Sequence, residues 1–229
     1  MSKETYLERC KGAIWFPFTS QQEVLIVGAG GSGSFTALAI SRLGCDLIVY
    51  DLDSYESHNM TGQLAQINDI GINKAVAIRE TLHGFSPSCR INAIEKMYDD
   101  NSMTCPITVC CPDNNATRRL VFNKWIEQQW ENPYAIYLDI RIGWDIIEIF
   151  CVTRDKAEDY RNTLLDDSNY RDDMCTTKQT TYTAQIGGGM IANYLKNYIM
   201  QVEEATIFDI PFYTNYNLTK MEISHDLGY

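Results

Sequence analysis

Apolar and polar residues form blocks along this chain whose lengths match those of strands and helices. A strand that is buried on both faces is a nearly continuous apolar run, and such runs occur at 24–27, 47–50, 90–94, 107–111, 135–140 and 146–152. Longer stretches with helical periodicity occur at 34–43, 73–82, 116–130 and 182–202, the last in spite of three consecutive glycines.

This order of elements predicts an α/β fold with a Rossmann-like, mostly parallel sheet and helices on both faces. The last two strand segments are expected to form an antiparallel extension. No internal repeat or low-complexity linker interrupts the chain, so residues 1–229 are predicted to be one domain. Between 153 and 181 the chain is polar, which predicts a short helix followed by a crossover loop. A C-terminal helix and tail are expected after it.

Composition and charge restrict the partners and the compartment. The formal net charge of −11 argues against binding the backbone of a nucleic acid. No apolar run is long enough to span a membrane, and the first residues lack the apolar core of a secretory signal. We therefore expect a cytoplasmic protein with reduced cysteines. The sequence contains no Cys-x-x-Cys, so no zinc is expected.

The first predicted strand runs into a turn with glycines at Gly28, Gly30, Gly31 and Gly33. Glycines let a backbone approach a phosphate closely, and the following helix would present its N-terminal N–H groups to that phosphate. The second strand ends at Asp51, about 20 residues later, which is the spacing of a ribose-binding acid in a βαβ unit. The pattern therefore predicts a nucleotide site.

Two further residues favour nucleotidyl transfer over hydride transfer. Lys74 lies in the first turn of a predicted helix, where it can neutralise charge on a triphosphate. Asp113 follows the fourth predicted strand, at the sheet edge where ligands bind, and an acid there can hold Mg²⁺. For Asp113, capping of the helix that follows is an alternative that is compatible with metal binding.

Together these motifs resemble the ThiF/MoeB/E1-like superfamily, whose members adenylate the C-terminal carboxylates of ubiquitin-like proteins. The resemblance covers residues 23–200. The matching residues are Gly28, Gly30, Gly31 and Gly33; Asp51, Asp53 and Asn59; Gly71 and Lys74; and Asp113, Asn114 and Arg118.

The resemblance implies that ATP is bound, with Asp51 on its ribose, Asn59 and Lys74 on its phosphates, and Mg²⁺ on Asp113. Asp53 would lie beside this site. It also implies a ubiquitin-like or sulfur-carrier protein as partner and a homodimer as the oligomeric state. Because the chain lacks the family's Cys-x-x-Cys zinc motifs, it resembles the small, zinc-free bacterial or phage-type branches of this superfamily.

One phosphate-binding residue of the family is absent. The family's Asn-x-x-Arg-Gln is Asn59-Met-Thr-Gly62-Gln63 here, and a glycine cannot replace a guanidinium. Arg9, Arg42 or an arginine of a second subunit could substitute, and the sequence does not select one of them.

Cys175 is the candidate acyl acceptor, because Met174-Cys-Thr-Thr-Lys178 resembles the active-cysteine signature of E1 enzymes. The positions of the signature's prolines are Asp173 and Thr181 in this chain. Lys178 would lower the pKa of a nucleophilic thiol, whereas Asp173 would raise it. A thioester-forming cysteine and an ordinary loop cysteine are both compatible with this pattern.

Asp139-Ile-Arg141, at a predicted strand end, indicates either an ion pair that fixes the strand or a substrate contact, and we favour the ion pair.

Four functions remain open. The first is adenylation of a protein carboxylate, with Lys74 and Asp113 as catalytic residues and a thioester on Cys175 as a further step. The others are activation of a small-molecule or tRNA-linked carboxylate, a non-catalytic scaffold, and an NAD-dependent oxidoreductase.

Overall fold

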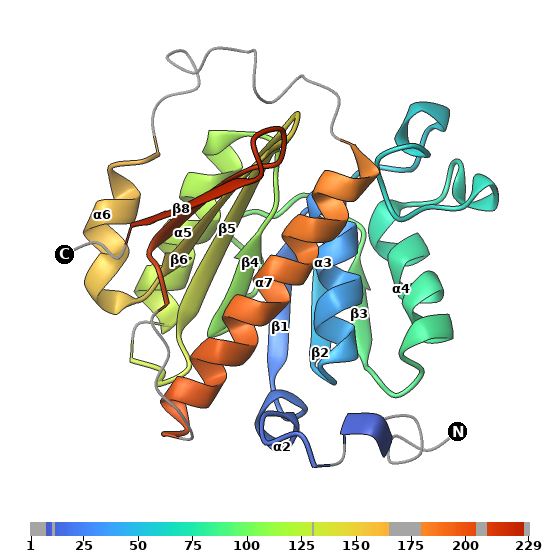
Figure 1. Ribbon diagram of the computed structural model, residues 1–229. Coiled ribbons are helices and arrows are strands. Elements are labelled where there is room, and N and C mark those ends of the chain that lie inside the picture. The colour runs from blue at the N-terminus through green and yellow to red at the C-terminus, as the bar shows by residue number, and fades with distance from the viewer. Residues whose placement is uncertain (1–7, 11, 130, 165–179, 205–209, 227–229) are drawn as a thin grey trace.

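The computed structural model describes residues 8–10, 12–129, 131–164, 180–204 and 210–226 (Figure 1). Within them the strands form one eight-stranded sheet in the order β3-β2-β1-β4-β5-β6-β7-β8. The strands are β1 (Glu23–Val27), β2 (Asp46–Tyr50), β3 (Ile91–Ile94), β4 (Ile107–Cys110), β5 (Ile136–Gly143), β6 (Ile146–Val152), β7 (Tyr213–Asn217) and β8 (Glu222–Asp226). The helices are α2 (Phe16–Thr19), α3 (Gly31–Arg42), α4 (Lys74–Phe85), α5 (Asn115–Gln129), α6 (Ala157–Arg161) and α7 (Thr181–Val202), with short 3-10 turns at Glu8–Cys10, Ser57–Asn59, Ile67–Asp69 and Arg154–Lys156.

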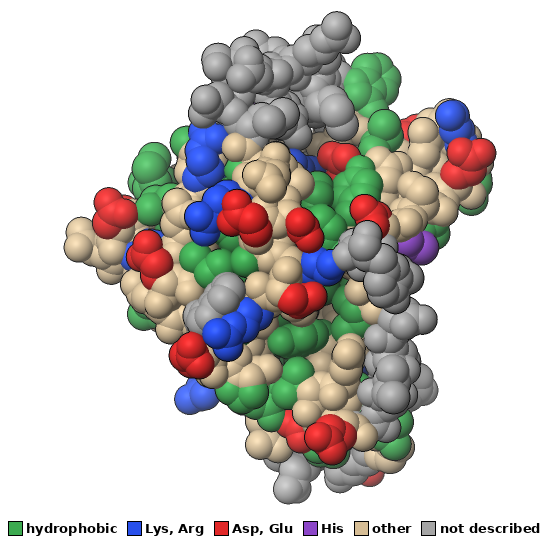
Figure 2. All heavy atoms as spheres, turned by 90° about the vertical axis from the view of Figure 1, so that its left-hand side faces the viewer, with side chains coloured by type: hydrophobic (Ala, Val, Ile, Leu, Met, Phe, Trp, Pro, Cys, Tyr) green, Lys and Arg blue, Asp and Glu red, His purple; other side chains and the backbone are tan. Residues whose placement is uncertain are grey.

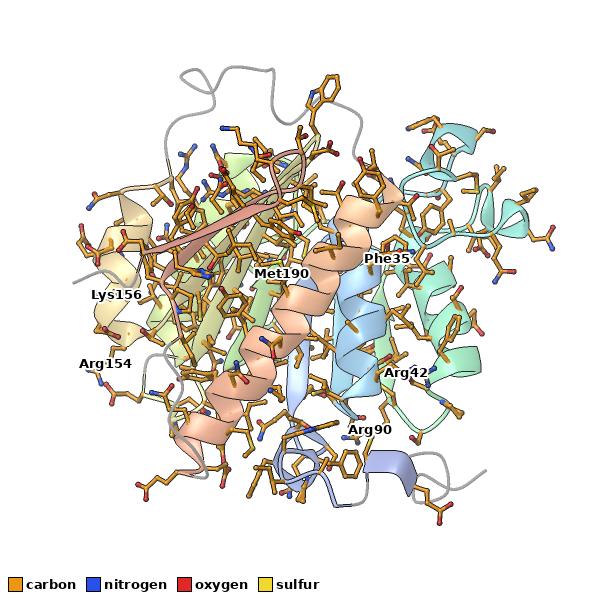
Figure 3. The ribbon with its side chains drawn as sticks, viewed as in Figure 1. Phe35, Arg42, Arg90, Arg154, Lys156 and Met190 are labelled. Carbon is orange, nitrogen blue, oxygen red and sulfur yellow. The ribbon has the colours of Figure 1, made fainter. Side chains whose placement is uncertain are left out.

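Strands β3, β2, β1, β4 and β5 run parallel, with β1 at the centre. Val27 pairs with Tyr50 on one side and with Cys110 on the other, so the ends of β1, β2 and β4 are level. Arg90, which directly precedes β3, lies at the lower edge of the sheet in Figure 3. The carboxyl ends therefore meet at the upper edge, and the predicted parallel sheet is confirmed.

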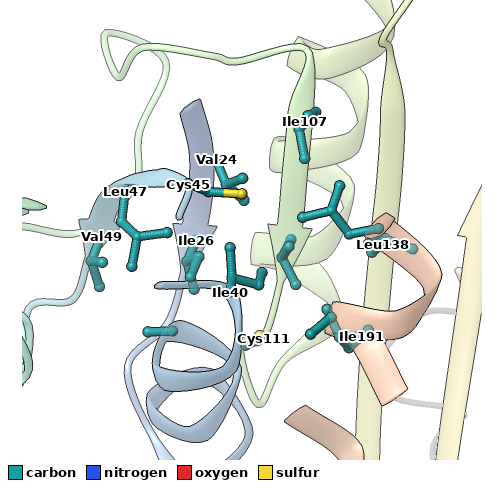
Figure 4. Packing of buried hydrophobic residues seen from close by; sticks show 14 of the residues in the cluster. Val24, Ile26, Ile40, Cys45, Leu47, Val49, Ile107, Cys111, Leu138 and Ile191 are labelled. Atoms are coloured by element: carbon teal, nitrogen blue, oxygen red, sulfur yellow. The ribbon is translucent and has the colours of Figure 1, made fainter. Parts of the chain in front are cut away.

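Helices cover both faces of the sheet, as the sequence predicts. On one face α3, α4 and α7 pack on a core that includes Val24, Ile26, Ile40, Leu138 and Ile191 (Figure 4). On the other face α5 and α6 pack on the alternate residues of the same strands, with aromatic side chains at the centre of that core: Phe122, Trp125, Tyr137, Phe150 and Tyr160. None of the described helices has the length and apolar character needed to cross a bilayer.

The glycines inside α7 allow it to pack closely on its neighbours. A Cβ on Gly188 would lie 2.7 Å from the backbone carbonyl carbon of Phe35 in α3, and one on Gly187 would lie 2.7 Å from Ile140 Cδ1 in β5. Phe35 and Met190 are labelled on the two adjacent helices in Figure 3. The glycines therefore place α7 directly against the helix that follows the glycine-rich turn, at a modest cost in helix propensity.

Strands β6, β7 and β8 extend the sheet in the antiparallel sense. The hairpin of β5 and β6 was predicted, whereas β7 and β8 lie where only a tail was expected after the last helix. β7 consists of Tyr and polar residues, and every residue of β8 is exposed, so neither strand has the apolar run that marks a buried strand.

A buried ion network fixes β5 at the level where the neighbouring strand β4 ends. Asp139 is fully buried, and one of its carboxylate oxygens accepts a hydrogen bond from Arg118 of α5. Its other oxygen accepts hydrogen bonds from Arg141 Nε at 2.8 Å and from the Tyr160 hydroxyl at 3.0 Å. Arg118 also donates to the carbonyl oxygen of Pro112 at 2.5 Å. The predicted Asp139–Arg141 ion pair is confirmed, and Arg118 adds a second ion pair to the same carboxylate.

Replacing Asp139 with Asn should lower the free energy of unfolding by about 3–5 kcal/mol, because two guanidinium groups would lose their buried counterion. Urea unfolding followed by circular dichroism measures this change. Glu131→Gln is the matched control, since Glu131 and Arg154 form a solvent-exposed pair at 3.7 Å, and it should unfold like the wild type. An Asp139→Asn variant that unfolds at the wild-type urea concentration would contradict this assignment.

Candidate functional site

The glycine-rich turn joins β1 to α3 at the carboxyl edge of the sheet. Gly28 has φ +93°, and its N–H donates to the Tyr50 carbonyl at 2.9 Å. A Cβ on Gly33 would lie 1.9 Å from the Gly28 carbonyl oxygen, so only glycine lets α3 begin against the turn. A Cβ on Gly30 would meet no atom within 4 Å, and Gly30 caps α3, which begins at Gly31, without a side-chain hydrogen bond. The space beside Gly30, the residue before the first turn of α3, is therefore open, and a helix N-terminus favours anions.

Asp51 joins the end of β2 to this turn. Its Oδ2 accepts a hydrogen bond from the Ala29 N–H at 2.6 Å, and its Oδ1 accepts one from the Asp53 N–H at 2.8 Å. Burial raises the pKa of the Asp51 carboxyl, while these two hydrogen bonds and the positive charge of Lys74 oppose the rise. Each carboxylate oxygen can accept a further hydrogen bond, so the carboxylate keeps acceptor capacity for a ligand.

Lys74 is the first residue of α4 and reaches back toward β2. Its Nζ lies 3.0 Å from Asp53 Oδ2, and its N–H donates to the Asp53 carbonyl at 2.8 Å. The Lys74 side chain is 11% exposed and that of Asp53 is 69% exposed, so the ammonium is largely enclosed and its partner is open to solvent. The structure thus brings Asp51, Asp53 and Lys74 together at the glycine turn.

Asn73 is a residue of this site that the sequence analysis did not identify. Its Oδ1 caps α4 by accepting from the N–H groups of Ala75 and Val76, and its Nδ2 donates to the Asp51 carbonyl at 3.0 Å. One side chain therefore fixes the start of α4, and with it Lys74, relative to the end of β2. The Asn at the first position of the predicted helix 73–82 was the available signal, because Asn is a preferred N-cap.

Asn59 is buried, and its Oδ1 accepts a hydrogen bond from the Glu56 N–H at 2.8 Å. This bond closes the turn 56–59, so the amide oxygen has a local structural role. Gly62 follows this turn and does not adopt a positive φ, so a residue with a side chain can take its backbone conformation. The segment is held near α3 by the Leu64 N–H, which donates to Ser34 Oγ at 3.1 Å.

Arg42 cannot substitute for the missing arginine from within this subunit. It is the last residue of the 12-residue helix α3, and its Nη1 donates to the Phe85 carbonyl at 2.7 Å. The rise of an α-helix puts it about 16 Å from the helix N-terminus. Figure 3 shows Arg42 at the lower end of the helix. The side chain of Arg9 lies outside the described part of the chain.

Asp113 is exposed in the loop between β4 and α5. The N-cap of α5 is Asn114, whose Oδ1 accepts from the Thr117 N–H at 2.8 Å, so Asp113 does not cap the helix. Arg118 holds the preceding carbonyl, that of Pro112, at 2.5 Å. The Asp113 carboxylate is therefore carried on an anchored loop, and its Oδ1 accepts a hydrogen bond from Asn114 Nδ2 at 3.2 Å.

Cys175 lies outside the described residues, so its role stays a prediction. The described cysteines form no disulfide, and most are buried. Burial raises the pKa of Cys105 to about 11 and that of Cys151 to about 12, and it also raises the pKa of Cys110 and Cys111. Such thiols are poor nucleophiles at neutral pH.

At the carboxyl edge of the sheet, a metal ion could be bound only by isolated carboxylates among the described residues. Within the described ranges, no group of three or more His, Cys, Asp or Glu side chains is placed to hold a metal ion. Asp113 alone would suit Mg²⁺, which commonly binds one or two carboxylates together with waters and substrate phosphates.

Three kinds of comparison place the chain among known proteins. The profile of the ThiF family matches residues 19–227. The chain is 33% identical over 81 residues to tRNA threonylcarbamoyladenosine dehydratase 2 of Saccharomyces cerevisiae, covering 34% of this chain and 18% of that protein. It is 38% identical over 72 residues to ubiquitin-like modifier-activating enzyme 5 of Caenorhabditis elegans, covering 31% and 17%. The matched segments thus span less than a fifth of these relatives.

Solved structures share the fold at low sequence identity. Escherichia coli MccB with AMPCPP and MccA has a TM-score of 0.68 at 16% identity, covering 93% of this chain and 66% of that one. The E. coli tRNA N6-threonylcarbamoyladenosine dehydratase TcdA has a TM-score of 0.67 at 15% identity, covering 88% and 95%. With the family profile matching nearly the whole chain, this protein belongs to the ThiF family.

Proposed function

We propose that this protein uses ATP to adenylate the C-terminal carboxylate of a small ubiquitin-like or sulfur-carrier protein. The observation that carries the proposal is the placement of Lys74 and Asp113 at the same sheet edge as the open glycine turn. A turn and an acid alone would serve many nucleotide enzymes, whereas the added ammonium and second acid suit a triphosphate with Mg²⁺. Membership of the ThiF family supports the same chemistry.

ATP would lie across the turn, with its phosphates on the open side at Gly30 and its ribose on Asp51. Lys74 would exchange its exposed partner Asp53 for phosphate oxygens, which requires little rearrangement because Asp53 is mostly solvent-exposed. Asn59 would contact the phosphates through its amide nitrogen. Asp113 would hold Mg²⁺, which would neutralise charge on the triphosphate.

In the reaction a carboxylate oxygen of the partner bonds to the α-phosphorus, and the bond from that phosphorus to the bridging oxygen of the β-phosphate breaks. The products are the acyl adenylate and pyrophosphate, and no proton has to be removed from the carboxylate. The protein contributes orientation of the two anions and neutralisation of the charge that accumulates on pyrophosphate. Lys74 is the residue of this chain that we assign to that neutralisation.

Several further features belong to the same proposal. Cys175 would take the acyl group from the adenylate as a thioester, with AMP as the leaving group. The protein would act as a homodimer in the cytoplasm, and either Arg9 or an arginine of the second subunit would take the place of the family arginine that is missing at Gly62. The ubiquitin-like modifier-activating enzyme 5 of Caenorhabditis elegans, similar to this chain over its matched segment, supports a protein partner.

A second candidate is activation of a small-molecule or tRNA-linked carboxylate. The similarity to two tRNA threonylcarbamoyladenosine dehydratases favours it. The net charge of −11 argues against a tRNA substrate. If the protein were a nicotinamide-dependent oxidoreductase, Lys74 and Asp113 would have no role. If it were a non-catalytic scaffold, the anchored loop that carries Asp113 would have none.

Replacing Asp113 with Ala should weaken Mg-ATP binding at least tenfold, because the protein would lose its carboxylate ligand to the metal. Isothermal titration calorimetry measures the affinity, and the two proteins should bind ATP alike when EDTA removes Mg²⁺. Glu127→Ala, which removes an exposed acid elsewhere on α5, should bind Mg-ATP like the wild type. Heat on titration with NAD but not with Mg-ATP would overturn the proposal, and binding of neither would favour a scaffold.

Replacing Gly62 with Arg should tighten ATP binding about tenfold, because a guanidinium fork pairs with phosphate oxygens and the local backbone accepts a side chain. Calorimetry on the Gly62→Arg, Gly62→Lys and wild-type proteins gives the order of affinities. Lysine should recover only part of the gain, since it cannot pair in a bidentate manner. Equal affinities in all three proteins would show that position 62 does not face the phosphates.

A further inference from the structure

A tryptophan occupies a strained position at the tip of the β5–β6 hairpin. β5 ends at Gly143 and β6 begins at Ile146, so Trp144 and Asp145 form the loop. Trp144 has φ +51°, whereas the favoured two-residue hairpin turns place Gly, Asn or Asp at such positions. Its side chain is 65% exposed and thus repays little of the strain by packing. A bulky residue in this exposed, strained conformation points to a role outside folding.

The loop itself is held firmly by two other segments. Asp145 accepts side-chain hydrogen bonds from the Tyr182 hydroxyl of α7 and from Thr219 Oγ1 at 3.0 Å. The Asp145 carbonyl accepts from the Leu218 N–H at 2.7 Å, and the Trp144 carbonyl accepts from Thr183 Oγ1 at 3.2 Å. The indole is therefore exposed on a rigid support, which lowers the entropy lost when it is covered by a partner.

Each segment that meets at Asp145 contributes an exposed apolar side chain. Trp144 comes from the hairpin loop, Tyr182 (49% exposed) from the first turn of α7, and Met221 (75% exposed) from the turn between β7 and β8. We call these three residues the tip patch. Trp, Tyr and Met are enriched at protein interfaces, where rigid aromatic residues supply much of the binding energy.

The tip patch projects past the carboxyl edge of the sheet, the same edge at which the proposed nucleotide site lies. Cys110, the last residue of β4, pairs with Asp139, and β5 continues past it to Gly143. The hairpin therefore projects beyond the edge that carries Asp113. In Figure 2, which shows the left-hand side of the molecule in Figure 1, acidic and basic side chains are interspersed, so charge does not mark an alternative docking region on this face.

The separation can be derived from strand geometry. Trp144 lies five residue steps along the chain from Asp139, or about 17 Å at 3.3 Å per residue, and two strand spacings of about 4.8 Å separate β5 from β1. The distance from the tip patch to the glycine turn is therefore on the order of 20 Å, which an extended chain of roughly six residues spans.

We propose that the tip patch binds an apolar side chain in the C-terminal tail of the polypeptide whose carboxylate is adenylated, about six residues before its end. The inference rests on the proposed function, because it assigns the occupant from the need to deliver a carboxylate to the turn. Docking the tail at this point makes the reaction of its end effectively intramolecular. The patch thus selects tails by length and by one apolar residue.

The test uses a library of randomised synthetic decapeptides with free C-terminal carboxylates, passed over the immobilised full-length protein. Trp144→Gly is the informative variant, because glycine relieves the positive φ while it removes the indole, and its melting temperature should equal or exceed that of the wild type. Trp144→Phe keeps an aromatic anchor. Ile14→Ser is the matched control, since Ile14 is 67% exposed and lies two residues before α2 in the chain, and α2 lies at the opposite edge of the sheet (Figure 1).

We expect the wild type, Trp144→Phe and Ile14→Ser to retain peptides that share an apolar residue about six positions from the C-terminus. Trp144→Gly should retain them at least tenfold less. The proposal is overturned if Trp144→Gly retains the same peptides, if the wild type retains none, or if sedimentation shows that Trp144→Gly dissociates a dimer. Retained peptides that support no ATP–pyrophosphate exchange would instead overturn the proposed adenylation and leave the docking surface in place.

Discussion

The position of α3 against the glycine turn is the constraint on which the rest of this structure depends. α3 can begin there only because Gly33 has no side chain, since a Cβ would lie 1.9 Å from the Gly28 carbonyl oxygen. The same turn receives Asp51, whose carboxylate accepts the Ala29 N–H at 2.6 Å. On its far side α3 packs against α7, where Gly188 permits backbone contact. A displacement of α3 would therefore disturb the turn, the acid and the helix behind it together.

The ammonium group of the candidate site has its counterion within the protein. Lys74 is mostly enclosed and pairs with Asp53, whose carboxylate remains exposed to water. An exposed carboxylate loses little hydration in such a pair and contributes little net stability to it, so a phosphate can replace it at low cost. The enclosed lysine, by contrast, keeps its position through the backbone bond to Asp53 and through the Asn73 cap. The cation is thus preorganised while its counterion is exchangeable.

Sequence patterns predicted the central sheet and the meeting of Asp51, Asp53 and Lys74 at the glycine turn, because both follow from local spacing. Strands buried on two faces are read as apolar runs, and the glycines, Asp51 and Lys74 lie at spacings fixed by a βαβ unit. β7 and β8 were not predicted, because their stability comes from pairing with β6 and not from an apolar run of their own. The contact of Arg118 with Asp139 joins residues 21 positions apart and becomes evident only when α5 is placed beside β5. For Asp113 the sequence left capping open, and the adjacent Asn114 performs it.

The proposed reaction needs nucleotide binding and selection of a carboxylate, and these two requirements depend on the sequence in different ways. Binding of a nucleotide needs backbone N–H groups, a lysine and acids at fixed spacing, and these requirements leave little freedom to the sequence. Selection of the carboxylate needs a surface at the right distance, which a hairpin supplies by its length and by the residue at its tip. A strained tryptophan at that tip satisfies no rule of local structure, which is why motif analysis passes over it. Members of one family can thus share the nucleotide chemistry and still select different partners, because partner selection depends on the identity of exposed residues, which folding constrains only weakly.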